Sequence, residues 1–149
     1  MAADILDRTL VNPQVVAPGV TFEWTHEGRI VLFRLTTIAR DSLDAYAEHY
    51  IRAVGDASAT QPFLAMVDFS HDEMSFTPYL RQKINEMEAA VPGDVPGKLA
   101  LLMENTMRSQ VFRLIMRAFE APRMKKQFQR QIFLNEADAI KWLEQGLSK

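Results

Sequence analysis

The feature that most constrains this chain is the alternation of short apolar runs with helical apolar stripes. Two uninterrupted apolar runs, Phe63 to Val67 and Leu99 to Met103, are bounded by loop residues, which is typical of strands buried in the middle of a sheet. Between them, apolar residues recur every three or four positions from Leu80 to Val91, which is the spacing of one helix face. Strands that alternate with helices imply crossover connections and a largely parallel sheet.

The remaining segments extend this pattern at both ends of the chain. Val20, Phe22 and Trp24 alternate with polar residues as in a half-buried strand, and Ile30 to Leu35 forms a second strand after a short polar turn. A last strand at Phe128 to Phe133 mixes polar and apolar residues, which favours a place near an edge of the sheet.

Four helices are predicted from stripes and start signals. The start signals are Asp41-Ser42, Thr77-Pro78, Asn105-Thr106, and Asn135 with Asp138 three residues later. The sequence therefore predicts an α/β fold in the order β-β-α-β-α-β-α-β-α. Its sheet is mixed, mostly parallel and five-stranded, and an antiparallel hairpin opens it.

Composition indicates one domain without disulfides. A chain of 149 residues with 48% apolar residues and a net charge of -2 can bury a single core, and it does not have the composition of a disordered chain. The absence of cysteine excludes a disulfide scaffold, a cysteine nucleophile and a thiolate metal site. No apolar run approaches the ~18 residues of a membrane span, and a secretory signal pattern is missing. We expect a cytoplasmic protein with residues 1–17 as an N-terminal lead-in and residues 18–149 as one domain.

Motifs of catalysis and cofactor binding are missing from the sequence. It contains no glycine-rich nucleotide loop, no P-loop and no serine elbow, and the three histidines lack metal-site spacing. His71, Asp72 and Glu73 follow the central strand and form either a solvated acidic loop or a weak acid/base site. We expect no enzymatic activity, no cofactor and no metal. The alternative is an enzyme that uses His71 with Asp68 or Asp72.

The last third of the chain suggests two kinds of partner. Residues 1–97 hold 7 basic and 14 acidic residues, whereas residues 98–149 hold 10 and 5. The positive charge either lies on solvated faces or meets an anionic partner, and no nucleic-acid motif accompanies it, so we expect no nucleic-acid binding. The helix predicted after Asn105 has a wide apolar arc that needs cover on more than one side, by the sheet and by a ligand or a second subunit. A candidate ligand groove therefore comprises Phe112, Arg113, Met116, Arg117 and Phe119.

Three hydroxyl residues, Ser70, Ser75 and Thr77, lie between Asp68 and a predicted helix start. Free amides and the helix dipole favour negative charge at such a place. The three residues are either ordinary turn and cap residues or candidate phospho-acceptors in a loop that meets a partner.

Several landmarks of residues 18–147 occur together in one order. They are the early hairpin, the strand end Asp68-Phe69-Ser70, the apolar strand at 98–102, the strand end Ile132-Phe133, and the helix with Ala139-Ile140-Lys141-Trp142-Leu143. This order resembles STAS and SEC14-type proteins related to the SpoIIAA anti-sigma-factor antagonist.

The resemblance implies a compact sheet and helix domain that is generally not catalytic. Some relatives are switched by phosphorylation of a serine at the start of the helix after the central strand, in an Asp-Ser-Ser/Thr-Gly pattern. Here the stretch is Met74-Ser75-Phe76-Thr77-Pro78, without that aspartate and glycine. The SEC14 side of the resemblance implies an apolar small-molecule or lipid cavity.

These observations predict a non-enzymatic regulatory or protein-interaction domain of STAS and SpoIIAA-like type, with a homodimer as one arrangement. The alternative is a SEC14-like carrier or sensor of an apolar or anionic-lipid small molecule.

Overall fold

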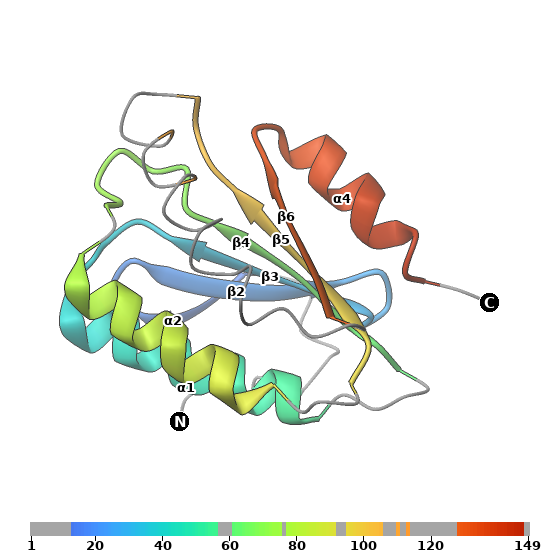
Figure 1. Cartoon of the computed structure of the whole chain (residues 1–149), viewed down its shortest axis with the longest axis horizontal. Coiled ribbons are helices and arrows are strands. Elements are labelled where there is room, and N and C mark those ends of the chain that lie inside the picture. Colours follow the sequence, from blue (N-terminus) through green and yellow to red (C-terminus); the bar gives the residue numbers. More distant parts are fainter. Residues whose placement is uncertain are drawn as a thin grey trace.

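The computed structural model describes residues 13–56, 61–75, 77–91, 95–105, 110, 113 and 128–147. Within them, six strands form one sheet in chain order: β1 (Gln14–Ala17), β2 (Val20–Thr25), β3 (Ile30–Leu35), β4 (Phe63–Asp68), β5 (Gly97–Leu102) and β6 (Phe128–Phe133). The described helices are α1 (Arg40–Gly55), α2 (Pro78–Ala90) and α4 (Glu136–Glu144) (Figure 1). The first three strands pair antiparallel and β3 to β6 pair parallel, which confirms a mixed α/β fold.

The sheet has one strand more than the five predicted. β1 comes from the end of the predicted N-terminal lead-in and pairs antiparallel with β2, with an irregularity in register between Val15 and Ala17. A strand of four residues in which Val15 is 75% exposed has too little apolar alternation to be recognised from sequence. The helix predicted from Asn105 to Ala121 lies outside the described residues, apart from helical positions at Gln110 and Arg113.

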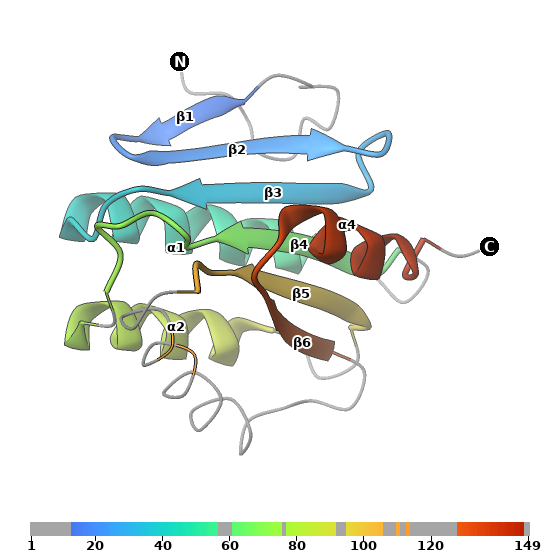
Figure 2. The same cartoon turned by 90° about the horizontal axis from the view of Figure 1, so that it is seen from above.

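Helices cover both faces of the sheet. Figures 1 and 2 show α1 and α2 side by side on one face and α4 on the other, with the strands in order from β1 to β6. Because successive strand residues point to opposite faces, each central strand contributes to two apolar clusters. The larger cluster lies under α1 and α2 and includes Phe33 and Val67, whereas the smaller lies under α4 and includes Leu32 and Met66.

Aromatic rings connect α1 to the strands within the larger cluster. Tyr46 meets Phe33 edge-on with ring centroids 5.5 Å apart, and Tyr50 meets Phe63 edge-on at 5.4 Å. Phe63 in turn stacks on Phe128 of β6 at 6.1 Å. Such pairs contribute about 0.5–1.5 kcal/mol each beyond the burial of their area, so they help fix the helix on the sheet.

The predicted cap of the first helix is wrong. α1 begins at Arg40 with Ala39 at the N-cap position and no side-chain cap, while Asp41 lies in the first turn. Ser42 is 3% exposed and donates a hydrogen bond from Oγ to the Pro18 carbonyl oxygen at 2.6 Å. Its hydroxyl therefore hydrogen-bonds to a carbonyl group in the turn between β1 and β2, a contact that local sequence does not reveal.

Candidate functional site

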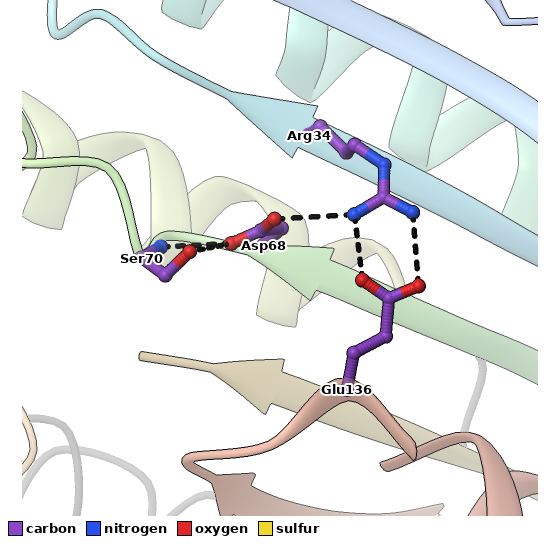
Figure 3. A network of polar contacts seen from close by, with 4 residues as sticks. All are labelled: Arg34, Asp68, Ser70 and Glu136. Carbon is purple, nitrogen blue, oxygen red and sulfur yellow. Dashed lines mark hydrogen bonds and ion pairs between the residues drawn. The ribbon is translucent and has the colours of Figure 1, made fainter. Parts of the chain in front are cut away.

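A polar network lies where β3 and β4 end and α4 begins. Arg34 of β3 and Asp68 of β4 are direct partners in the parallel register. Each is two residues beyond a member of the smaller cluster, Leu32 or Met66, and so lies on the face that α4 covers. Figure 3 shows Glu136, the first residue of α4, facing the Arg34 guanidinium across this edge of the sheet.

Arg34 binds two carboxylates at once. Its Nη1 and Nη2 donate to Oε1 and Oε2 of Glu136 at 3.0 and 3.1 Å, and Nη1 also lies 3.2 Å from Asp68 Oδ2. The hydrogen bonds to Glu136 are the main reason that the pKa of Arg34 is raised, with burial acting in the opposite sense. A paired guanidinium and carboxylate form two parallel hydrogen bonds, so this contact fixes orientation as well as distance.

Ser70 joins the network through the second oxygen of Asp68. Oδ1 of Asp68 accepts hydrogen bonds from the Ser70 amide at 2.8 Å and from Ser70 Oγ at 2.5 Å (Figure 3). Asp68 thus binds Arg34 with one oxygen and Ser70 with the other. The loop after β4 is thereby connected to the first turn of α4.

The other two predicted hydroxyl residues lie on the approach to α2. The Thr77 hydroxyl oxygen accepts a hydrogen bond from the Leu80 amide at 3.1 Å, and Pro78 follows at the first helical position, which confirms the predicted cap. The Ser75 carbonyl oxygen accepts from the Thr77 amide at 3.1 Å. Ser70 is therefore the one of the three that hydrogen-bonds to the Arg34 network.

Replacing Thr77 with alanine is expected to lower the free energy of unfolding by about 1 kcal/mol, because the Leu80 amide loses its cap. Urea unfolding of the wild type, Thr77→Ala and Thr77→Ser measures this difference. Thr77→Ser keeps a hydroxyl cap and is expected to remain close to the wild type. Equal losses in the two variants would contradict a capping role.

The exposed loop at residues 71–73 does not join this network. The amide of Glu73 donates to Nδ1 of His71 at 3.1 Å, and both side chains are exposed. The hydrogen bonds of Asp68 go to Arg34 and Ser70. The alternative hypothesis of an enzyme paired His71 with Asp68 or with Asp72, and the first of these two pairings is not formed in this structure.

Polar contacts also hold the far end of α4. Nε2 of His26 lies 2.8 Å from Glu144 Oε2, and Lys98 Nζ donates to the Trp142 carbonyl oxygen at 3.2 Å. The Lys98 ammonium also lies 4.8 Å from the centre of the Trp142 indole. Acidic groups at the helix start and basic groups at its end match the helix dipole, so α4 is fixed at both ends.

A further exposed contact joins α1 to α2. The Tyr79 hydroxyl donates to the Asp44 carboxylate, and Lys83 Nζ lies 3.0 Å from Asp44 Oδ1. The guanidinium of Arg40 lies 4.6 Å from the centre of the Tyr79 ring. The hydrogen bond from Tyr79 is the main reason that the pKa of Asp44 is lowered, followed by the hydrogen bond from Lys83.

Tyr79→Phe is therefore expected to raise the pKa of Asp44 toward its ordinary value. A lowered folded-state pKa means that this contact stabilises the fold above the unfolded pKa of about 3.9, and that the contribution is lost as pH falls through the folded pKa. NMR titration of the Asp44 carboxyl carbon in both proteins measures the change. An Asp44 pKa that is the same in both would contradict the assignment.

The candidate ligand groove falls largely on residues that the structure does not describe. Phe112, Met116, Arg117 and Phe119 lie outside the described residues, and Arg113 is a half-buried helical residue. The described residues line a cavity of about 30 Å³ between α1, α2, β5 and β6, which has room for about two water molecules. This cavity is too small for a lipid.

Sequence reasoning missed a buried ion pair beside that cavity. Arg130 Nε donates to Glu88 Oε2 at 2.7 Å and Nη2 to Oε1, with the two side chains only 1% and 10% exposed. The spacing of these two residues from buried apolar residues indicated that both face the core. Glu88 is four residues after Ile84 on the buried face of α2, and Arg130 is two residues after the buried Phe128. Charge made both residues look exposed, although periodicity placed them inside.

Comparison with protein-family models, with curated proteins and with solved structures finds no match to this chain. Within the described ranges, no helix is both long enough and apolar enough to cross a membrane.

Proposed function

We propose that this chain is a non-enzymatic regulatory domain of the STAS and SpoIIAA-like kind, which binds a protein partner through the loop at residues 70–77. The observation that carries the proposal is the hydrogen-bonded path from Ser70 through Asp68 and Arg34 to Glu136. Through this path, a change of charge in the loop reaches α4 on the other side of the network. A regulatory domain needs such a connection between the contact surface and a second element.

The loop also offers side chains for a partner to contact. His71, Asp72 and Glu73 are exposed and follow directly on Ser70. Among the three candidate phospho-acceptors, we favour Ser70, since a phosphoryl group there would repel Asp68 and compete for Arg34. Thr77 is less suited because its hydroxyl already caps α2.

A matched pair of charge reversals tests the surface. Glu73→Lys changes the exposed loop, whereas Glu48→Lys makes the same change on the exposed middle of α1. Tagged wild-type chain is cross-linked in the cells that produce it, and the partner is identified and quantified by mass spectrometry. We expect one stoichiometric partner, a loss of at least tenfold with Glu73→Lys, and little change with Glu48→Lys. Retention by Glu73→Lys would contradict the proposed surface.

A second pair tests the switch. Ser70→Asp is expected to alter partner binding several-fold, because a carboxylate there meets Asp68, whereas Ser70→Ala should change it much less.

Native mass spectrometry of the purified chain, followed by solvent extraction, reports whether an apolar molecule is bound. A stoichiometric extractable adduct together with unchanged partner binding in both Ser70 variants would favour the lipid-carrier function instead.

A further inference from the structure

The cavity between α1, α2, β5 and β6 combines an apolar wall with a buried charge. Met87, Leu99 and Tyr46 line it together with the ion-paired Glu88 and Arg130. Burying an ion pair removes both groups from bulk water, and the loss is offset only when their remaining hydrogen-bonding positions are also met. A molecule that occupies the cavity therefore has to meet the hydrogen-bonding positions of these charged groups.

The Glu88 carboxylate has hydrogen-bonding positions beyond those that Arg130 uses. An ionised carboxylate has about four acceptor positions on its two oxygens, and Arg130 donates one hydrogen bond to each oxygen. Nη1 of Arg130 is directed to the Phe128 carbonyl oxygen at 3.2 Å instead. Among the described residues, Arg130 is the side chain that donates to Glu88, so acceptor positions on the carboxylate are left for another donor.

Tyr46, which carries a hydroxyl group, also lines this cavity. The residue is 2% exposed, and its pKa is raised well above the ordinary value, chiefly by burial and then by the nearby Tyr50 and Glu88. Because Glu88 contributes to the raised pKa of Tyr46, the Glu88 carboxylate lies near enough to the phenol to act on it electrostatically. A small molecule that both donates and accepts hydrogen bonds would suit this pair of groups.

We propose that this cavity is an internal water site, in which one or two ordered water molecules hydrogen-bond to the Glu88 carboxylate and the Tyr46 hydroxyl. A volume of about 30 Å³ is roughly two to three times the minimum that one water molecule needs. A site for water needs polar partners as well as room, whereas a purely apolar cavity of similar size stays dry. Glu88 and Tyr46 supply those partners on α2 and α1.

NMR cross-relaxation between water and cavity methyl groups tests the proposal on the full chain. We expect the Met87 and Leu99 methyl groups to show water NOE and ROE signals of opposite sign, which is the signature of long-lived water. The Leu64 methyl groups, buried under α4 on the other face, serve as the internal control and should show none. Absence of these signals at Met87 and Leu99 would overturn the proposal.

Two variants separate water from other occupants. The double variant Glu88→Met and Arg130→Met makes the site apolar, so it should lose the water signals and respond to dissolved xenon. Tyr46→Phe changes only one hydroxyl group, and it should weaken the water signals at least twofold. Unchanged signals in Tyr46→Phe, or a xenon response of the wild type equal to that of the double variant, would also overturn the proposal.

Discussion

Replacing Arg130 with methionine is expected to lower the free energy of unfolding by about 3–5 kcal/mol. The side chain of Arg130 is 1% exposed and binds Glu88, whose side chain is 10% exposed. Removing the guanidinium leaves the Glu88 carboxylate inside the larger cluster without its cation. Urea unfolding at neutral pH, followed by circular dichroism, measures the difference.

The second half of this experiment replaces both partners. Glu88→Met together with Arg130→Met removes the charges and fills similar volume with apolar atoms, so most of the lost stability is expected to return. Arg29→Met, at an exposed position in the turn between β2 and β3, is the control for losing one arginine and should shift stability by less than about 0.5 kcal/mol. An Arg130→Met variant as stable as Arg29→Met would contradict the role of the buried pair.

Gly97→Ala is expected to destabilise the protein by about 3 kcal/mol, at the upper end of the usual cost of overpacking. Gly97 lies in β5 between Phe63 of β4 and Phe128 of β6. A Cβ atom at Gly97 would lie 2.4 Å from the Phe63 carbonyl oxygen and 3.2 Å from the Phe128 ring. The strands would have to move apart where the aromatic rings of Phe63 and Phe128 stack.

The same substitution at Gly55 provides a matched control. Gly55 is the last residue of α1, and a Cβ atom there would meet nothing within 4 Å. Gly55→Ala is expected to leave stability unchanged or raise it by about 0.5 kcal/mol, because alanine restricts the unfolded chain more than glycine does. Similar losses in both variants would show that general loss of glycine, rather than a clash between strands, causes the effect.

Local sequence patterns predicted most of the described elements. The alternation of apolar and polar residues from Val20 to Trp24 predicted β2, and the continuous apolar run from Phe63 to Val67 predicted β4. Both patterns lie within one short stretch of sequence, so they can be recognised without knowledge of the fold. The caps at Thr77 and Asn135 were also predicted, because each bonds an amide only three residues away. The strand β1 was missed because its pairing with β2, and not its own composition, makes it a strand.

The candidate site could be predicted only in part. Sequence analysis named Asp68 and Ser70 as parts of one strand end, and the structure adds the hydrogen bonds between these two residues. Arg34 was not included, since its partner Glu136 is 102 residues away along the chain. The proposed connection between the loop and α4 thus depends on a contact that no local pattern contains.

Sequence alone determined most of the described strands and helices, β1 excepted, and which of their faces are apolar, because these depend on neighbours within about one helical turn or two strand residues. The tertiary structure decided which charged groups meet. It brought Arg34 to Glu136 at one edge of the sheet and Arg130 to Glu88, 42 residues apart, inside the core. Periodicity fixes the face on which a side chain lies, but the identity of its partner follows from strand order, register and helix placement.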